Sequence, residues 1–185
     1  FDSLRFRSIG PAAMGGRIDD VEAVPGDPLT IYVATASGGL WKTTNKGTTW
    51  TSIFEHQPVA TFGDVAIFGA DPRILYVGTG EQNNRQSSSW GNGVYKSTDA
   101  GKTWTHLGLE RTRHIGRIAI HPTNPDIAWV AAAGNLWSAS TERGIYRTTD
   151  GGRTWTRTLY VDSLTGATDV VVNPRDPNLL IAATY

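Results

Sequence analysis

The amino-acid sequence predicts an all-β fold, a β-propeller made of four-stranded antiparallel blades. One motif of turn residues ending in tryptophan occurs three times, at residues 43–50, 97–104 and 148–155. Each copy follows a short apolar and aromatic run, which is the pattern of a strand, a tight turn and a second strand. The closing tryptophans are 54 and then 51 residues apart. A repeat of about 50 residues made of strands and turns is typical of propellers with one blade per repeat.

Every copy of the motif has a structural explanation. Its Asp or Asn is expected to accept hydrogen bonds from backbone N–H groups of the turn, and its Gly to adopt a positive φ. Its Trp is expected to anchor the next strand in the core. The residues assigned to this structural role are Asn45, Gly47, Trp50, Asp99, Gly101, Trp104, Asp150, Gly152 and Trp155.

The repeat divides the chain into three complete blades and half of a fourth. The expected blades are about residues 16–60, 61–111, 112–163 and, in part, 164–185. Residues 1–15 alternate apolar and polar side chains and are expected to form an N-terminal strand that closes the ring. We therefore expect a segment of a larger propeller, of seven blades, whose first partner is the rest of that propeller.

Composition excludes several classes of function. Seventeen basic and seventeen acidic residues give zero formal net charge, which argues against a nucleic-acid partner. No apolar run is long enough for a membrane span. The chain has no cysteine, so it has no disulfide or thiolate site. Its four histidines show no metal-ligand spacing, and neither a metal nor a cofactor is expected.

The repeated Ser/Thr-x-Asp-x-Gly-x-Thr-Trp resembles the Asp-box (BNR) repeat of sialidases, sortilin-type receptors, xyloglucanases and photosystem assembly factors. Three stretches in the first part of the chain look closer to large secreted bacterial proteins labelled glycosyl hydrolase or sortilin-like. These stretches are residues 6–11, 16–18 and 37–44. The resemblance implies a secreted or periplasmic propeller with carbohydrate-related relatives.

The resemblance also gives a specific argument against xyloglucanase activity. In xyloglucanases a catalytic Asp follows the second strand of the first blade, in a Thr-Asp-x-Gly-Gly context. Here residues 35–39 are Thr-Ala-Ser-Gly-Gly, so Ala36 occupies the place of the carboxylate. An alanine cannot act as an acid or a base. The arginine cluster of sialidases also has no assignable counterpart.

Two long loops are expected on the rim opposite the motif turns, where a binding surface would lie. The polar loop 79–92 and the loop 133–143 each carry a tryptophan that could stack on a sugar ring. A hydrogen-bonded loop with packed aromatics is the structural alternative. The ligand-binding candidates in these loops are Glu81, Asn83, Asn84, Arg85, Trp90 and Trp137.

A second set of candidates begins the inner strand of each blade. Alignment of the repeats places Asp20, Asp64, Arg117 and Asp169 in one column around the central channel. They could bind a cation or a sugar hydroxyl, or they could form ion pairs and capping contacts. No catalytic residue is assigned, and Asp64 and Glu81 are weak candidates that should affect binding more than stability.

Two functions remain open. The first, which we favour, is a binding module that presents its rim to a glycan, a peptide or a protein partner. The second is a glycoside hydrolase whose remaining catalytic residues lie outside residues 1–185, since hydrolysis needs two carboxylates about 5–10 Å apart. The removal of the expected acid at Ala36 favours binding over hydrolysis.

Overall fold

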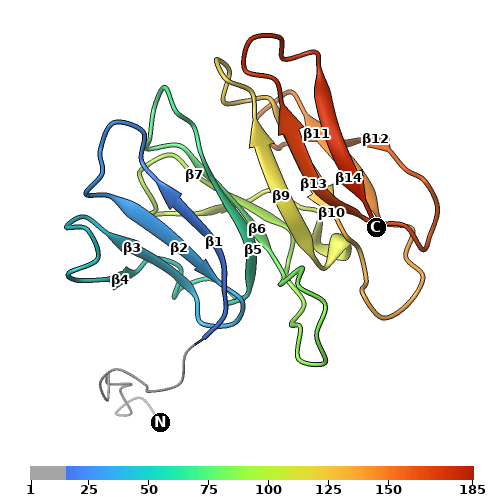
Figure 1. Ribbon diagram of the computed structural model, residues 1–185, viewed down its shortest axis with the longest axis horizontal. Coiled ribbons are helices and arrows are strands. Elements are labelled where there is room, and N and C mark those ends of the chain that lie inside the picture. The colour runs from blue at the N-terminus through green and yellow to red at the C-terminus, as the bar shows by residue number, and fades with distance from the viewer. Residues whose placement is uncertain (1–15) are drawn as a thin grey trace.

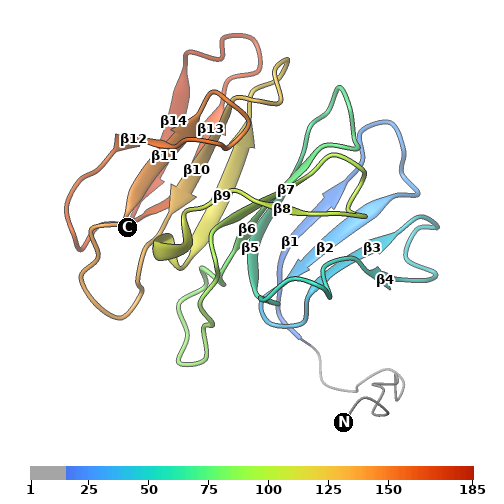
Figure 2. The ribbon, with the colours of Figure 1, turned by 180° about the vertical axis from the view of Figure 1, so that it is seen from behind.

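The computed structural model describes residues 16–185, and the strand predicted for residues 1–15 lies outside these residues. It contains three four-stranded antiparallel sheets and one two-stranded sheet, which succeed one another along the chain (Figures 1 and 2). The first sheet contains β1 (Ile18–Ala23), β2 (Ile31–Thr35), β3 (Leu40–Thr43) and β4 (Thr51–Ser52). The second contains β5 (Phe62–Ile67), β6 (Leu75–Thr79), β7 (Val94–Ser97) and β8 (Thr105–His106). A short 3₁₀ helix, η1 (Glu110–Thr112), leads to the third sheet.

The third sheet contains β9 (Ile115–Ile120), β10 (Ala128–Ala132), β11 (Gly144–Thr148) and β12 (Thr156–Leu159). The fourth contains β13 (Ala167–Val172) and β14 (Leu180–Thr184). In every sheet, strands adjacent in the sequence are paired, so each blade is an up-and-down meander. This is the predicted propeller architecture. No helix within residues 16–185 has the length and apolarity needed to cross a membrane.

The first strands of the four sheets, β1, β5, β9 and β13, contact one another in that order and form the inner edge of the blades. Apolar side chains fill the space between successive sheets in three clusters, one at each interface. The first is built around Tyr32, Phe54 and Phe62, and the second around Tyr76 and Ile115. Every residue of β6 and β10 is buried, so the second and third sheets are packed on both faces and each blade is held against the next.

Glycines allow the inner strands to approach each other closely. A Cβ atom added at Gly63 on β5 would overlap the carbonyl oxygen of Ile115 on β9. One added at Gly78 on β6 would overlap the side chain of the same isoleucine. Only hydrogen atoms fit at these positions, so the spacing of the second and third blades depends on both glycines.

The three repeated turns share one hydrogen-bond pattern. In the second blade, Asp99 Oδ1 accepts the N–H of Thr103 at 2.9 Å and Oδ2 accepts its hydroxyl at 2.6 Å. The Ser97 hydroxyl accepts the N–H of Gly101, whose φ is +86°. Asp150 makes the matching bonds to Thr154. These bonds lower the pKa of both carboxyls to about 2, because each donor favours the charged form.

We expect Asp99→Ala to lower the free energy of unfolding by about 1 kcal/mol, because it removes the acceptor of three turn donors, the Thr103 N–H, the Thr103 hydroxyl and the Ser97 hydroxyl. Asp99→Asn should cost less. Asn45 already fills this place in the first blade, where Oδ1 accepts the Thr49 N–H and Nδ2 donates to the Thr49 hydroxyl. Urea unfolding of the three proteins at pH 7 measures the difference. Equal losses for Ala and Asn would contradict this explanation of the turn.

The tryptophans that follow the turns join successive blades. Trp104 Nε1 donates to the carbonyl oxygen of Ile53 at 2.8 Å, and Trp155 Nε1 donates to that of Leu107 at 2.7 Å. Both acceptors belong to the preceding blade. Trp50 differs from the expected core position, because 40% of it is exposed. The exposure of Trp50 has a physical reason: Trp104 and Trp155 contact the preceding blade, and no blade precedes the first sheet within residues 16–185.

Candidate functional site

The long loops lie at the end of the blades opposite the repeated turns. The loops 80–93 and 133–143 connect the second and third strands of their sheets, whereas the repeated turns connect the third and fourth. Figure 1 shows both long loops at the lower end of the sheets, together with the start of β1. We call this end of the blades the rim. It contains most of the predicted binding residues.

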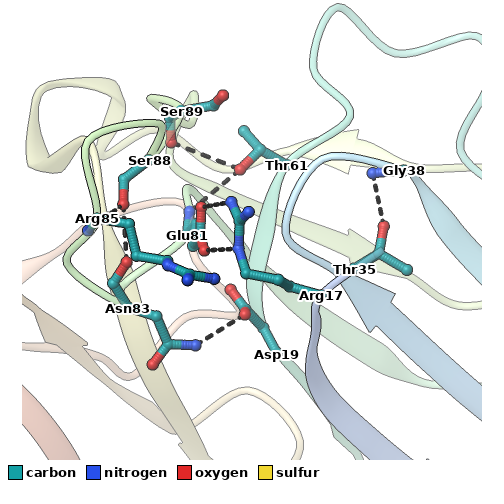
Figure 3. A network of polar contacts seen from close by, with 10 residues as sticks. All are labelled: Arg17, Asp19, Thr35, Gly38, Thr61, Glu81, Asn83, Arg85, Ser88 and Ser89. Carbon is teal, nitrogen blue, oxygen red and sulfur yellow. Dashed lines mark hydrogen bonds and ion pairs between the residues drawn. The ribbon is translucent and has the colours of Figure 1, made fainter. Parts of the chain in front are cut away.

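A partly buried ion pair fixes the longer loop to the first blade. Arg17 donates through Nε and Nη2 to the two carboxylate oxygens of Glu81, at 2.5 and 2.6 Å (Figure 3). The backbone N–H of Glu81 donates to the Thr61 hydroxyl at 3.1 Å. Glu81 is fully buried, so the prediction that it acts mainly on binding needs correction. Its carboxylate is bound by Arg17, so we expect a substitution at Glu81 to affect the stability of the loop more directly than binding.

The next contact along the loop involves Asp19 of β1. Asn83 donates through Nδ2 to Asp19 Oδ1 at 2.9 Å. The other oxygen, Oδ2, is withdrawn from solvent and has no hydrogen-bond partner within residues 16–185. Burial raises the pKa of the Asp19 carboxyl to about 6, against the lowering effect of Asn83. This residue was not among the sequence candidates.

The column of Asp20, Asp64, Arg117 and Asp169 is brought together by the structure. Arg117 lies 2.9 Å from Asp64, 3.3 Å from Asp169 and 3.8 Å from Asp20. Asp20 also accepts the backbone N–H of Val65, and Asp64 that of Ile118. Two carboxylates thus each bind the inner strand of the following blade. The geometry matches the ion-pair and capping alternative for this column.

Asp64 is 1% exposed, so the expectation of a small effect on stability does not suit its position. Burial and the negative charge of Asp20 raise its pKa to about 8, although Arg117 and the Ile118 N–H oppose the shift. Because this pKa lies above the value of 3.8 expected in the unfolded chain, the Asp64 carboxyl stabilises the fold most at a pH below 3.8. The contribution is lost as the pH rises through about 8.

A cavity of about 600 Å³ opens between the two long loops and the fourth sheet. Its wall combines the amides of Gln82, Asn83 and Asn84 with the Thr168 hydroxyl and the apolar Leu136. Arg143, which is 7% exposed, also contributes to the wall. Asp169, one of the predicted binding residues, lies in the same wall. Such a mixture of amide, hydroxyl, charged and apolar groups suits a small polar ligand with apolar faces.

Arg143 organises the loop 133–143. Its guanidinium donates to the carbonyl oxygens of Ala133, Asn135 and Ser138 in this loop and of Ser163 between the third and fourth sheets. Burial lowers its pKa from the ordinary value, and the negative charge of Asp162 opposes this. The donors of Arg143 are therefore used mainly to shape the loop.

The two rim tryptophans are both exposed, at 53% each. The guanidinium of Arg113 lies 3.7 Å from the centre of the Trp90 ring, so one face of this indole is covered. Trp137 follows Leu136 of the cavity wall, and its backbone N–H donates to the Asn135 side chain. Arg85 is also exposed, and its backbone N–H donates to the Ser88 hydroxyl.

Within residues 16–185, no group of three or more His, Asp or Glu side chains could hold a metal ion. Among the four histidines, only His114 is fully buried. Neither of its ring nitrogens has a hydrogen-bond partner in this part of the chain. Burial lowers its pKa, so the neutral ring is favoured.

Three rim residues escaped the sequence argument: Arg17, Asp19 and Arg143. A repeat alignment compares equivalent positions of the blades. It does not reveal a side chain whose partner lies in a neighbouring blade. For Asp19 a signal was present, since the equivalent positions of the next two blades are Gly63 and Gly116.

A comparison with models of protein families gives one match. The model of the Sortilin-Vps10 family, described as sortilin and neurotensin receptor 3, matches residues 92–185, which are 94 of the 185 residues. The chain belongs to the Sortilin-Vps10 family. This membership agrees with the sortilin-like resemblance of its motifs.

This Sortilin-Vps10 member is also similar to xyloglucanases. The xyloglucanase Xgh74A of Acetivibrio thermocellus is 28% identical over 172 residues, which covers 75% of this chain and 19% of the relative. A xyloglucanase from Paenibacillus sp is 26% identical over 173 residues, covering 75% of this chain and 16% of the relative. The chain thus spans less than a fifth of the length of these xyloglucanases.

Solved structures share the fold. An ancestral GH74 enzyme superimposes with a TM-score of 0.71 and 21% identity, over 91% of this chain and 22% of the enzyme. The GH74 enzyme of Niastella koreensis superimposes with a TM-score of 0.67 and 24% identity, over 88% of this chain and 24% of the enzyme. YCF48 of Cyanidioschyzon merolae superimposes with a TM-score of 0.55 and 19% identity, over 82% of this chain and 42% of YCF48. These similarities support the propeller fold of the Sortilin-Vps10 member.

Proposed function

We propose that the rim of this propeller binds a glycan, as part of a larger glycoside-hydrolase-like protein that acts outside the cytoplasm. The observation that carries the proposal is the cavity between the long loops, with its amide, hydroxyl and apolar wall beside the exposed Trp137. Amides and hydroxyls can pair with sugar hydroxyl groups, and an indole suits the C–H face of a sugar ring. In this proposal the repeated turns are structural Asp boxes.

The similarity to xyloglucanases favours a second candidate, hydrolysis of a glycan by the whole protein. The groups within residues 16–185 support binding more than hydrolysis. Glu81 is held by Arg17, Asp64 is held by Arg117 and the Ile118 N–H, and Ala36 has no carboxyl group. A hydrolase would therefore need acids from other parts of the protein.

Binding can be measured by titration calorimetry of the chain with xyloglucan heptasaccharide, a neutral glycan. Trp137→Ala should weaken binding about 10-fold, because a stacking surface is lost. Trp50→Ala is the matched control: it removes another exposed tryptophan, from the turn that ends the third strand, and should change affinity less than about 2-fold. Equal losses in the two variants would contradict the proposal. So would binding of a peptide or protein partner through these loops without any glycan affinity.

A further inference from the structure

The side chain of Gln82 lies where three blades meet at the rim. It belongs to the loop 80–93 of the second sheet and reaches the first strand of the third sheet. A Cβ atom added at Gly116 would overlap Gln82 Oε1 and would lie 2.5 Å from the carbonyl oxygen of Thr168. Gly116 and Thr168 are the bulge residues of β9 and β13, which the strand pairing skips. The absence of a side chain at Gly116 therefore leaves room for the glutamine beside the bulges.

The amide of Gln82 is open to solvent and lines the cavity. Its neighbours use their polar groups inside the protein, since Glu81 pairs with Arg17 and Asn83 donates to Asp19. Within residues 16–185 the Gln82 amide forms no hydrogen bond, and neither of its atoms is among the buried polar atoms left without a partner. The residue is half-buried and belongs to the wall of the cavity of about 600 Å³. Both its donor and its acceptor are therefore available to a ligand in that cavity.

The other polar groups of the cavity wall are less available. Arg143 donates to backbone carbonyl oxygens, and the Asp169 carboxylate accepts from Arg117. Asn84 is exposed on the loop. Ordering an exposed side chain on binding costs more conformational entropy than ordering one that already packs against the protein. The half-buried Gln82 is thus the group of the wall best placed to recognise a ligand.

We propose that Gln82 recognises the ligand of the rim by binding two adjacent hydroxyl groups of a neutral sugar ring. A primary amide carries a donor and an acceptor side by side. Nε2 can donate to one hydroxyl oxygen while Oε1 accepts the hydrogen of the adjacent hydroxyl. The inference rests on the proposed glycan function and adds the class of ligand, a neutral sugar with a free pair of adjacent hydroxyl groups.

A neutral ligand suits the charges of the cavity. The charged side chains that residues 16–185 contribute to its wall are Asp169 and Arg143. Arg143 already binds carbonyl oxygens, so its guanidinium is not free for an anion. The Asp169 side chain is 48% exposed and would repel a carboxylate. A sugar that carries a carboxylate is therefore disfavoured.

The test compares Gln82→Met with Gln86→Met by calorimetric titration of the protein with xyloglucan heptasaccharide. Methionine keeps the length of glutamine and has no amide. Gln82→Met should weaken binding about 10-fold, because two hydrogen bonds to the ligand are lost. Gln86 is exposed on the same loop and outside the cavity wall, so its variant is the matched control and should change affinity less than about 2-fold. The melting temperature of Gln82→Met should remain that of the wild type, because its amide holds no other described residue.

A second ligand tests the pair of hydroxyl groups. The fully O-methylated heptasaccharide has no hydroxyl donor, so Gln82→Met should not weaken its binding further. Wild-type binding of the methylated glycan that is as tight as that of the free glycan would refute recognition through hydroxyl groups. Tighter binding of a sialylated oligosaccharide than of the neutral one would refute the ligand class.

The remaining outcomes separate this inference from the proposed function. Equal heptasaccharide affinities of the wild type and Gln82→Met would refute the role of Gln82 and leave glycan binding in place. A loss of affinity together with a lower melting temperature would assign Gln82 a structural role instead. No binding of the heptasaccharide to the wild type would refute both proposals.

Discussion

Replacement of Gly63 by alanine should destabilise the protein by more than about 3 kcal/mol, a large loss for the addition of one methyl group. The added Cβ would overlap the Ile115 carbonyl oxygen and lie 2.9 Å from that of Gly80. Both obstacles are backbone atoms in neighbouring strands or loops, so no side chain can rotate away. The inner strands β5 and β9 would have to separate.

Gly69→Ala is the matched control for this prediction. Gly69 has no atom within 4 Å of an added Cβ and does not require a positive φ. Its replacement should change the free energy of unfolding by no more than about 1 kcal/mol in either direction. Urea unfolding followed by tryptophan fluorescence compares the two variants. Similar stabilities would show that the second and third blades are not as close as the structure places them.

The second large effect concerns the Arg17–Glu81 pair. Glu81→Gln should lower the free energy of unfolding by about 1–3 kcal/mol, because a charged pair of hydrogen bonds inside the rim is lost. Arg17→Met should cost more than Glu81→Gln. It leaves a fully buried carboxylate without its partner, whereas Glu81→Gln leaves a guanidinium that is about one-third exposed and can be hydrated.

A double-mutant cycle tests the origin of this asymmetry. The Arg17→Met/Glu81→Gln protein should be more stable than the sum of the single losses predicts, because no unpaired charge remains. Additive losses would mean that the two side chains act independently. In that case the loop 80–93 would be held to the first blade mainly by other contacts, such as Thr61 and Asn83.

The fold was predictable because its signal repeats. Tryptophan spacing, turn chemistry and strand order all depend on short-range patterns, and the structure shows the predicted succession of antiparallel sheets. The exposure of Trp50 was not predicted, since a repeat assigns equal surroundings to equal positions. Within residues 16–185 the first blade lacks the preceding blade that Trp104 and Trp155 contact.

The candidate site was only partly predictable. The repeat brought Arg117 and its three aspartates into one column, and the structure places them within ion-pair distance. The sequence could not show that Glu81 is buried against Arg17, 64 residues earlier, because the contact crosses from one blade to the next. The same limit concealed Asp19, whose direction depends on a bulge.

The most direct test of glycan binding at the rim is a chemical-shift map of the isotope-labelled chain with xyloglucan heptasaccharide. We predict that the perturbed amides and indole groups lie in residues 79–93 and 133–143, including the Trp137 indole. The turns at residues 97–104 and 148–155 should be unaffected, because each follows the end of the third strand that lies away from the long loop. Perturbations confined to these turns, or none at saturating ligand, would contradict the proposed function.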